Sequence, residues 1–228
     1  MASTLKLDRY RQAAPQLYEL LRDKIVALEY LPGAVLSRVD ISMQFNVSQT
    51  PVREALLRLA EERLVDVFPQ AATRVSLIDT HIAEETHFLR RAIELEIVRE
   101  LALHGAPSLI ATLRDLVATQ VRLRDRQDYD GFVVADREFH RSLYAAVGKE
   151  ELWRLVCSRS GHIDRLRRLH LPAGDKMARI VDDHGRILEA ITGRDPGAAQ
   201  DRLRQHLSGT LENMDRIRDE HPQYFVQG

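Results

Sequence analysis

The stretch VSQTPVREALLRL (residues 47–59) decides the fold. Ser48 or Thr50 can cap a helix, and Pro51 suits the first helical position, where a missing N–H is best tolerated. The apolar residues that follow recur at helical spacing and predict one buried face: Ala55, Leu56 and Leu59. A core helix needs a cap, but it does not need polar and basic side chains gathered at its exposed start. We therefore ask what that start contacts.

The segments on either side of this stretch form a recognisable order. Apolar residues at helical spacing run over 16–28, and Pro32-Gly33 ends that helix. Ser37 can cap a short second helix, after which Asn46 tolerates a left-handed turn. Residues 63–78 carry β-branched side chains around a Pro-Gln-Ala-Ala turn and predict two short strands. Helix, short helix, helix and hairpin is the order of a winged helix-turn-helix.

In that arrangement the second helix of the pair enters the DNA major groove by its N-terminal residues. Ser48 and Thr50 can reach phosphates, Gln49 can pair with adenine edges, and Arg53 can bind guanine or phosphate. Taken alone, the helix could equally be a capped core helix with solvated charges. The neighbouring helices and hairpin favour the DNA-binding interpretation.

The rest of the chain shows only helical patterns. Short connections between successive helices predict antiparallel neighbours and a single bundle. The six predicted helices span residues 82–104, 108–126, 130–147, 150–171, 176–191 and 196–218. The sequence thus predicts a mainly α protein, with a winged helix-turn-helix of three helices and a small hairpin at residues 1–78 and an all-α antiparallel bundle at 79–228.

Composition limits the class of protein. The 228 residues are 44% hydrophobic and 29% charged, and their net charge of −1 argues against a chain that coats nucleic acid generally, so any DNA-binding surface must be local. The single cysteine, Cys157, excludes an intramolecular disulfide and favours the cytoplasm. We find neither an apolar signal core nor a run long enough for a membrane helix, so no membrane partner is expected.

One carboxylate and three histidines in the bundle form a candidate metal site. Asp136 and His140 lie four residues apart and so share one helix face, while His184 and His206 lie among apolar residues of two later helices. If they converge, an Asp and three imidazoles suit Zn²⁺, Ni²⁺ or a similar borderline cation. The spacing alone is a weak signal, because an Asp-x-x-x-His pair is common and a histidine near apolar neighbours is usually a packing residue.

Three stretches resemble the GntR family of bacterial transcription regulators. PVREAL (51–56) and LEYLPGAVLS (28–37) resemble its DNA-binding domain, and DREFHRSL (136–143) with the helical remainder resembles the FadR-type effector domain, FCD. The likeness covers nearly the whole chain. Gln49 departs from the usual arginine, so a different operator is expected, and the hairpin tip lacks the usual glycine. Arg38, where many relatives have an acid, is expected to contact phosphate, and Arg74 on the hairpin completes the expected DNA contacts.

The resemblance also implies roles in the bundle. Asp136, His140, His184 and His206 fall on the four metal-ligand positions of the metal-binding FCD group, and the remaining histidines are expected at the surface or in packing. Arg90, the arginine of an R-x-x-x-E pattern, is expected to bind a small carboxylate effector, such as a sugar acid or a dicarboxylate. Arg159 and Arg165 are weaker candidates for the same role.

The implied protein is a homodimeric regulator that binds a palindromic operator, and repression relieved by ligand is the commoner behaviour of the family. Two alternatives stay open. In a metal sensor, the ion itself would be the signal. A metalloenzyme is the more distant one, because the sequence shows no nucleophile motif and Cys157 is solitary. We expect no enzymatic activity.

Overall fold

The computed structural model describes residues 7–8, 10–68, 72–105, 107–172 and 174–227. Internal contacts divide the chain into two units. The winged-helix unit consists of residues 1–80, 161–168 and 218–228, and the bundle unit consists of 81–160 and 169–217. The division at 78/79 stays a prediction about domains, and the contacts group two later segments with the first unit. Among the described residues, no helix has the length and apolarity needed to cross a bilayer.

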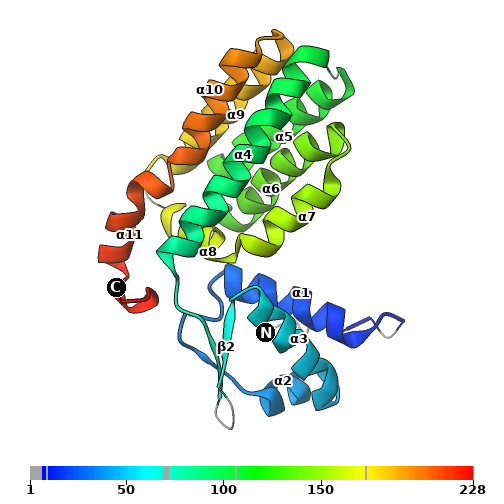
Figure 1. Cartoon of the computed structure of the whole chain (residues 1–228), viewed down its shortest axis with the longest axis vertical. Coiled ribbons are helices and arrows are strands. Elements are labelled where there is room, and N and C mark those ends of the chain that lie inside the picture. The colour runs from blue at the N-terminus through cyan, green and yellow to red at the C-terminus, as the bar shows by residue number, and fades with distance from the viewer. Residues whose placement is uncertain (1–6, 9, 69–71, 106, 173, 228) are drawn as a thin grey trace. The chain divides into compact units, whose positions relative to one another are not determined.

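Within residues 10–80, the described part of the winged-helix unit has three complete helices and a three-stranded sheet (Figure 1). Its elements are α1 (Ala13–Val26), β1 (Val35–Leu36), α2 (Arg38–Phe45), α3 (Gln49–Glu61), β2 (Val65–Val67) and β3 (Thr73–Val75). The strands are antiparallel in the order β1-β3-β2, and Val35 pairs with Arg74. The predicted hairpin is confirmed, whereas β1 was not predicted. The tip residues 69–71 lie outside the described residues.

Local signals set the start and end of α2 and α3. The Ser37 hydroxyl accepts a hydrogen bond from the Asp40 N–H at 3.2 Å, and Asn46 ends α2 with a left-handed φ of 52°. Ser48 occupies the N-cap position of α3. Pro51 is therefore the third residue of the helix, whereas the sequence pattern predicted it at the first. The position still suits proline, because the first four N–H groups of a helix have no intrahelical partner.

The core of the winged-helix unit lies between α1 and α3. Leu17 and Leu21 from α1 meet Val52 and Leu59 from α3, and all four are fully buried. Burial of such a side chain stabilises a fold by roughly 1.5–3 kcal/mol. This packing holds one face of α3 inside and leaves the opposite face in solvent.

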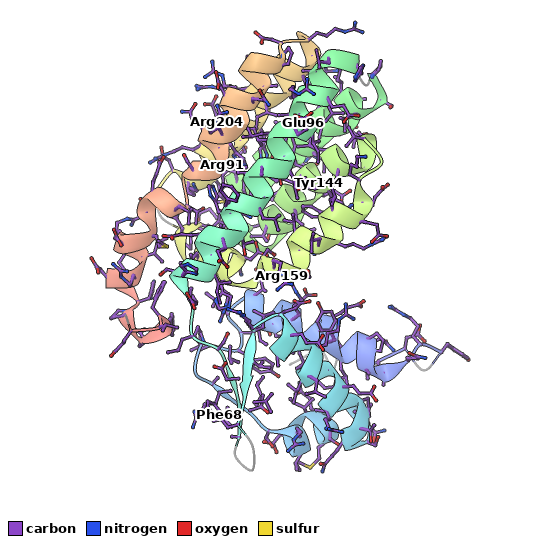
Figure 2. The ribbon with its side chains drawn as sticks, in the orientation of Figure 1. Phe68, Arg91, Glu96, Tyr144, Arg159 and Arg204 are labelled. Atoms are coloured by element: carbon purple, nitrogen blue, oxygen red, sulfur yellow. The ribbon has the colours of Figure 1, made fainter. Side chains whose placement is uncertain are left out.

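Six helices build the bundle unit. They are α4 (Thr80–His104), α5 (Pro107–Asp125), α6 (Tyr129–Ala146), α7 (Glu150–Arg159), α9 (Lys176–Thr192) and α10 (Pro196–Ser208). Helix α5 packs against α6 and α9, and α9 packs against α10. Glu96 lies exposed on the outside of α4, while Tyr144 of α6 is buried between the helices (Figure 2). The interior of this bundle is where the candidate metal ligands meet.

Two of the predicted helices are interrupted. The helix expected over 150–171 ends at Arg159, and α8 (Gly161–His170) follows after Ser160. A Cβ at residue 161 would overlap the Leu64 side chain, so glycine lets α8 lie close to Leu64 without displacing it. The helix expected over 196–218 also breaks near Gly209, and a 3-10 turn (η1, Leu211–Asn213) and α11 (Met214–Glu220) follow it, with a second turn (η2, Pro222–Tyr224) near the end.

The first part of α8 belongs to the winged-helix unit through hydrogen bonds. His162 Nδ1 accepts from the Asp79 N–H at 3.0 Å, and its Nε2–H donates to the Arg63 carbonyl at 3.0 Å. Arg165 is fully buried and donates to the Ser76 carbonyl at 2.6 Å. The suggestion that Arg165 binds an effector is therefore wrong, because its guanidinium is committed to the end of the hairpin. His162 is a packing residue, as expected.

His162 should make the stability of the protein depend on pH. Burial, and then the charge of Arg165, lower the pKa of His162 to about 4. Its pKa in the unfolded chain is about 6.5, so the unfolded state binds more protons between pH 4 and 6.5. The contribution of neutral His162 to the free energy of unfolding is complete above pH 6.5 and is lost as the pH falls toward 4. Between pH 7 and 5, wild-type protein should lose about 2 kcal/mol more of its free energy of unfolding than His162→Gln.

Urea unfolding of both proteins at the two pH values measures this difference. Glutamine is the matched replacement, because its amide can accept from Asp79 and donate to Arg63 but does not titrate in this range. Equal losses in the two proteins would contradict the assignment.

Candidate DNA-reading face and metal centre

The start of α3 presents its polar side chains to solvent. Ser48, Gln49, Thr50 and Arg53 are all exposed, whereas Val52 faces the core. The burial of Val52, Ala55, Leu56 and Leu59 fixes the rotation of the helix about its axis. The four polar residues are thus held outward at the N-terminal end of a packed helix, as a groove-reading helix requires.

The two other predicted DNA contacts are also exposed. Arg38 is the first residue of α2. Arg74 lies on the middle strand β3, where its guanidinium donates to the Gly33 carbonyl at 3.1 Å. Arg74 is therefore anchored to the chain ahead of β1. The contacts with DNA of all six residues stay predictions.

The four predicted metal ligands come together in the bundle unit. Asp136 and His140 from α6, His184 from α9 and His206 from α10 each offer a ligand atom, and these atoms lie within 4.8 Å of one another. The Nε2 atom of His206 lies 3.2 Å from Nε2 of His140 and 3.2 Å from Nε2 of His184. Asp136 Oδ1 lies 3.6 Å from Nε2 of His184.

These spacings suit a metal ion. Ligand nitrogens that lie 2.0–2.1 Å from a Zn²⁺ ion are about 3–3.4 Å apart, and His206 Nε2 lies 3.2 Å from Nε2 of each of the other two histidines. Three imidazoles and one carboxylate are a donor set for Zn²⁺, Ni²⁺ or a related cation. The residues present therefore fit a divalent metal, which would supply a Lewis acid if bound.

Burial keeps two of the cluster histidines, His140 and His184, neutral near pH 7. Desolvation, and then the charge of Arg90, lower the pKa of His140 to about 4. Desolvation also lowers the pKa of His184 well below its usual value, and the neighbouring His206 and His140 lower it further. A neutral imidazole has the lone pair that a metal requires.

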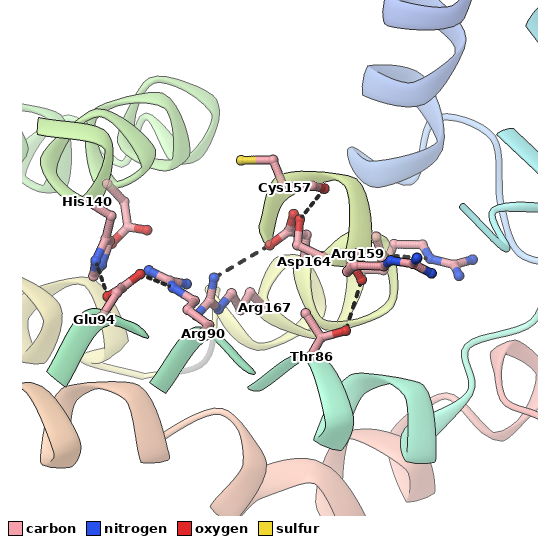
Figure 3. Close-up of polar contacts among 12 residues, drawn as sticks. Thr86, Arg90, Glu94, His140, Cys157, Arg159, Asp164 and Arg167 are labelled. Carbon is pink, nitrogen blue, oxygen red and sulfur yellow. Dashed lines mark hydrogen bonds and ion pairs between the residues drawn. The ribbon is translucent and has the colours of Figure 1, made fainter. Parts of the chain in front are cut away.

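Arg90 lies beside this cluster, in a buried ion pair. Its Nε donates to Glu94 Oε1 at 2.6 Å, and Glu94 Oε2 accepts from His140 Nδ1 at 2.9 Å (Figure 3). Burial raises the pKa of Glu94, but the charge of Arg90 and the hydrogen bonds from His140 and Arg90 lower it more, so the carboxylate is ionised. Burial lowers the pKa of Arg90, yet the charges of Glu94 and Asp136 raise it overall. Arg90 is thus charged, and Glu94 holds its Nε.

Arg159 does not join the cluster. It is exposed at the end of α7, and its carbonyl accepts a hydrogen bond from Thr86 Oγ1 at 2.9 Å. Its side chain is directed away from Glu94 and His140 (Figure 3). Its role in ligand binding stays a prediction.

Sequence reasoning missed Gln120 of α5, which is fully buried beside His184. A signal was present, because Gln120 follows Leu113 by seven residues and so falls on the buried side of a helical period. A polar residue at such a position must find a polar partner.

Comparison with known proteins agrees with this architecture. Residues 13–75 match the family described as bacterial regulatory proteins, gntR family, and residues 85–209 match the FCD domain. An HTH-type transcriptional regulator of Streptomyces ambofaciens is 36% identical, over 92% of this chain and 88% of its own. The transcriptional repressor RspR of Escherichia coli is 30% identical over the full length of both chains. The structure of McbR/YncC of E. coli has the same fold, with a TM-score of 0.77 and 20% identity over 92% of this chain and 99% of that one.

Both family matches and both relatives cover the two units together, and the relatives are regulators rather than enzymes. The chain belongs to the GntR family of bacterial regulatory proteins and is a DNA-binding transcription regulator with an FCD domain.

Proposed function

We propose that this regulator is a homodimeric repressor whose affinity for its operator is set by a small organic acid bound at a metal ion in the bundle unit. The observation that carries the proposal is the convergence of Asp136 and three histidine Nε2 atoms beside the charged Arg90. Its operon would be catabolic and its effector a sugar acid or a dicarboxylate. As a DNA-binding protein it would act in the cytoplasm.

The chemistry of the cluster favours an anionic ligand. Four protein ligands leave positions open on an octahedral ion such as Ni²⁺ or a Zn²⁺ with expanded coordination, and a carboxylate oxygen can fill them. Glu94 engages only the Nε atom of Arg90, and among the described residues Nη1 and Nη2 make no hydrogen bond. Those two atoms form the fork that binds a carboxylate in bidentate fashion.

The exposed start of α3 supports the DNA half of the proposal. Two copies of this helix in a dimer would read the two halves of a palindromic operator. The dimer would have one arrangement that binds the operator and one that does not. The acid can change operator affinity only if it binds these two arrangements with different affinities. Repression would be relieved if the acid prefers the second arrangement.

A titration of operator affinity tests this proposal. The probe is a fluorescent operator duplex selected from a random oligonucleotide pool, and the acids are a panel of sugar acids and dicarboxylates. With Zn²⁺ or Ni²⁺ bound, at least one acid should weaken operator binding about fivefold or more, as allosteric couplings usually do. In metal-free protein the same acid should have no effect.

The metal sensor is the alternative that this titration separates. There the metal alone would change operator affinity and no acid would add to the change. That result, or an acid response that persists without metal, would contradict the proposal.

A further inference from the structure

Two fully buried side chains lie behind the candidate metal ligands. Glu94 Oε2 lies 2.9 Å from His140 Nδ1, and Gln120 Oε1 lies 2.9 Å from His184 Nδ1. Neither Glu94 nor Gln120 has any exposed surface. Glu94 lies on α4 and Gln120 lies on α5, and neither helix carries one of the four predicted metal ligands. Each is thus placed to act on a ligand rather than on the metal.

The contacts with Glu94 and Gln120 determine which ring nitrogen of His140 and His184 carries the hydrogen. An ionised carboxylate can only accept a hydrogen bond, so His140 must donate through Nδ1–H. The carbonyl oxygen of Gln120 likewise accepts from Nδ1–H of His184. In both neutral rings the lone pair then lies on Nε2, and both Nε2 atoms face His206 Nε2 at 3.2 Å. A single hydrogen on His206 Nε2 can satisfy only one of them, whereas a cation between the rings can accept all three lone pairs.

We propose that Glu94 and Gln120 are positioning residues that preset His140 and His184 to bind a divalent metal through Nε2. The inference rests on the proposed metal site and extends it to two helices outside the ligand set. Hydrogen-bonded partners of this kind fix the tautomer and orientation of a ligating histidine, and losing one typically lowers metal affinity 10–100-fold.

The two positioning residues differ in how firmly they act. Arg90 holds the other oxygen of Glu94 at 2.6 Å, so this carboxylate is fixed from both sides. The amide nitrogen of Gln120 makes no hydrogen bond among the described residues. If the amide turned over, it would donate to His184 Nδ1, and the ring hydrogen would then block Nε2. An ionised glutamate at position 120 could only accept a hydrogen bond from His184 Nδ1.

Variants of Gln120 provide the test. The leucine variant Gln120→Leu removes the acceptor and places an apolar side chain of similar size at this core position, and Gln200→Leu is the matched control. The Gln200 amide donates to the Leu95 carbonyl in the same bundle and has no contact with a cluster histidine. Competition with a chromophoric chelator measures the affinity for Zn²⁺. We expect a loss of about 10–100-fold in Gln120→Leu, affinity near that of wild type in Gln200→Leu, and affinity at or above that of wild type in Gln120→Glu.

Nitrogen NMR of ¹⁵N-histidine protein gives a readout that needs no metal. Metal-free wild-type protein should show the Nδ1–H form for both His140 and His184, and Gln120→Leu should lose that preference at His184 alone. An Nε2–H form at both histidines, or unchanged affinity and tautomer in Gln120→Leu, would overturn the inference. Wild-type protein that shows both Nδ1–H forms and yet binds no metal would support the tautomer assignment and overturn the proposed metal function instead.

Discussion

Replacing Arg53 by alanine should lower affinity for the specific operator about tenfold to a hundredfold. Arg53 is exposed on the first turns of α3, outside the face that Val52, Leu56 and Leu59 bury. The variant removes no core contact, so the helix should remain in place while one base or phosphate contact is lost. A bidentate contact between an arginine and a guanine contributes roughly 1–3 kcal/mol to discrimination between bases.

Fluorescence anisotropy with the operator duplex at fixed salt measures the effect. Arg99→Ala is the matched control, because Arg99 lies on α4, where it pairs with the exposed Glu96. We expect the control to bind like wild type, and both variants to keep the wild-type midpoint of thermal unfolding. If Arg53→Ala binds the operator as tightly as wild type does, α3 does not read DNA through this residue.

Removing two cluster histidines should abolish metal binding. His140→Ala/His184→Ala deletes two of the three Nε2 donors, and the loss should exceed the 10–100-fold typical of outer-shell changes, reaching at least about a thousandfold. A metal at a hundred times its dissociation constant stabilises the folded state by about 2.7 kcal/mol. For a chain of this length, that corresponds to a rise of roughly 5–10 °C in the unfolding midpoint. The rise should occur in wild type and be absent in the double variant.

Metal analysis of protein purified without chelator, together with thermal scans, measures both quantities. His81→Ala/His104→Ala is the matched control, since both of its histidines are exposed on α4. Asp136→Asn provides a milder variant that keeps the shape of the carboxylate and loses its charge. If the double variant has the metal content of wild type, His140 and His184 do not bind the metal and the proposed site is wrong.

The fold of the winged-helix unit could be predicted because its signals are local. Ser37, Asn46 and the apolar spacing in α3 each act within a few residues, and each gave the correct element. The break before α8 could not be found in this way. Gly161, the first residue of α8, lies close to Leu64, which is far away in the sequence. Strand β1 has only two residues and exists through its pairing with β3.

The candidate site shows the same division between local and distant information. Helical spacing placed Asp136 and His140 on one face, but their meeting with His184 and His206 came from the resemblance and not from spacing. The pairing of Gln120 with His184 joins residues 64 positions apart, so only the three-dimensional structure reveals it. The pairing of Arg90 with Glu94 was visible as a spacing of four, although its complete burial was not.

Anomalous diffraction at the absorption edge of the bound metal, from crystals grown without chelator, tests the central claim most directly. The account predicts one peak in the bundle unit, bonded to Nε2 of His140, His184 and His206 and to a carboxylate oxygen of Asp136. A map without a peak among these four side chains, or a metal bonded to a histidine Nδ1 atom, would contradict it.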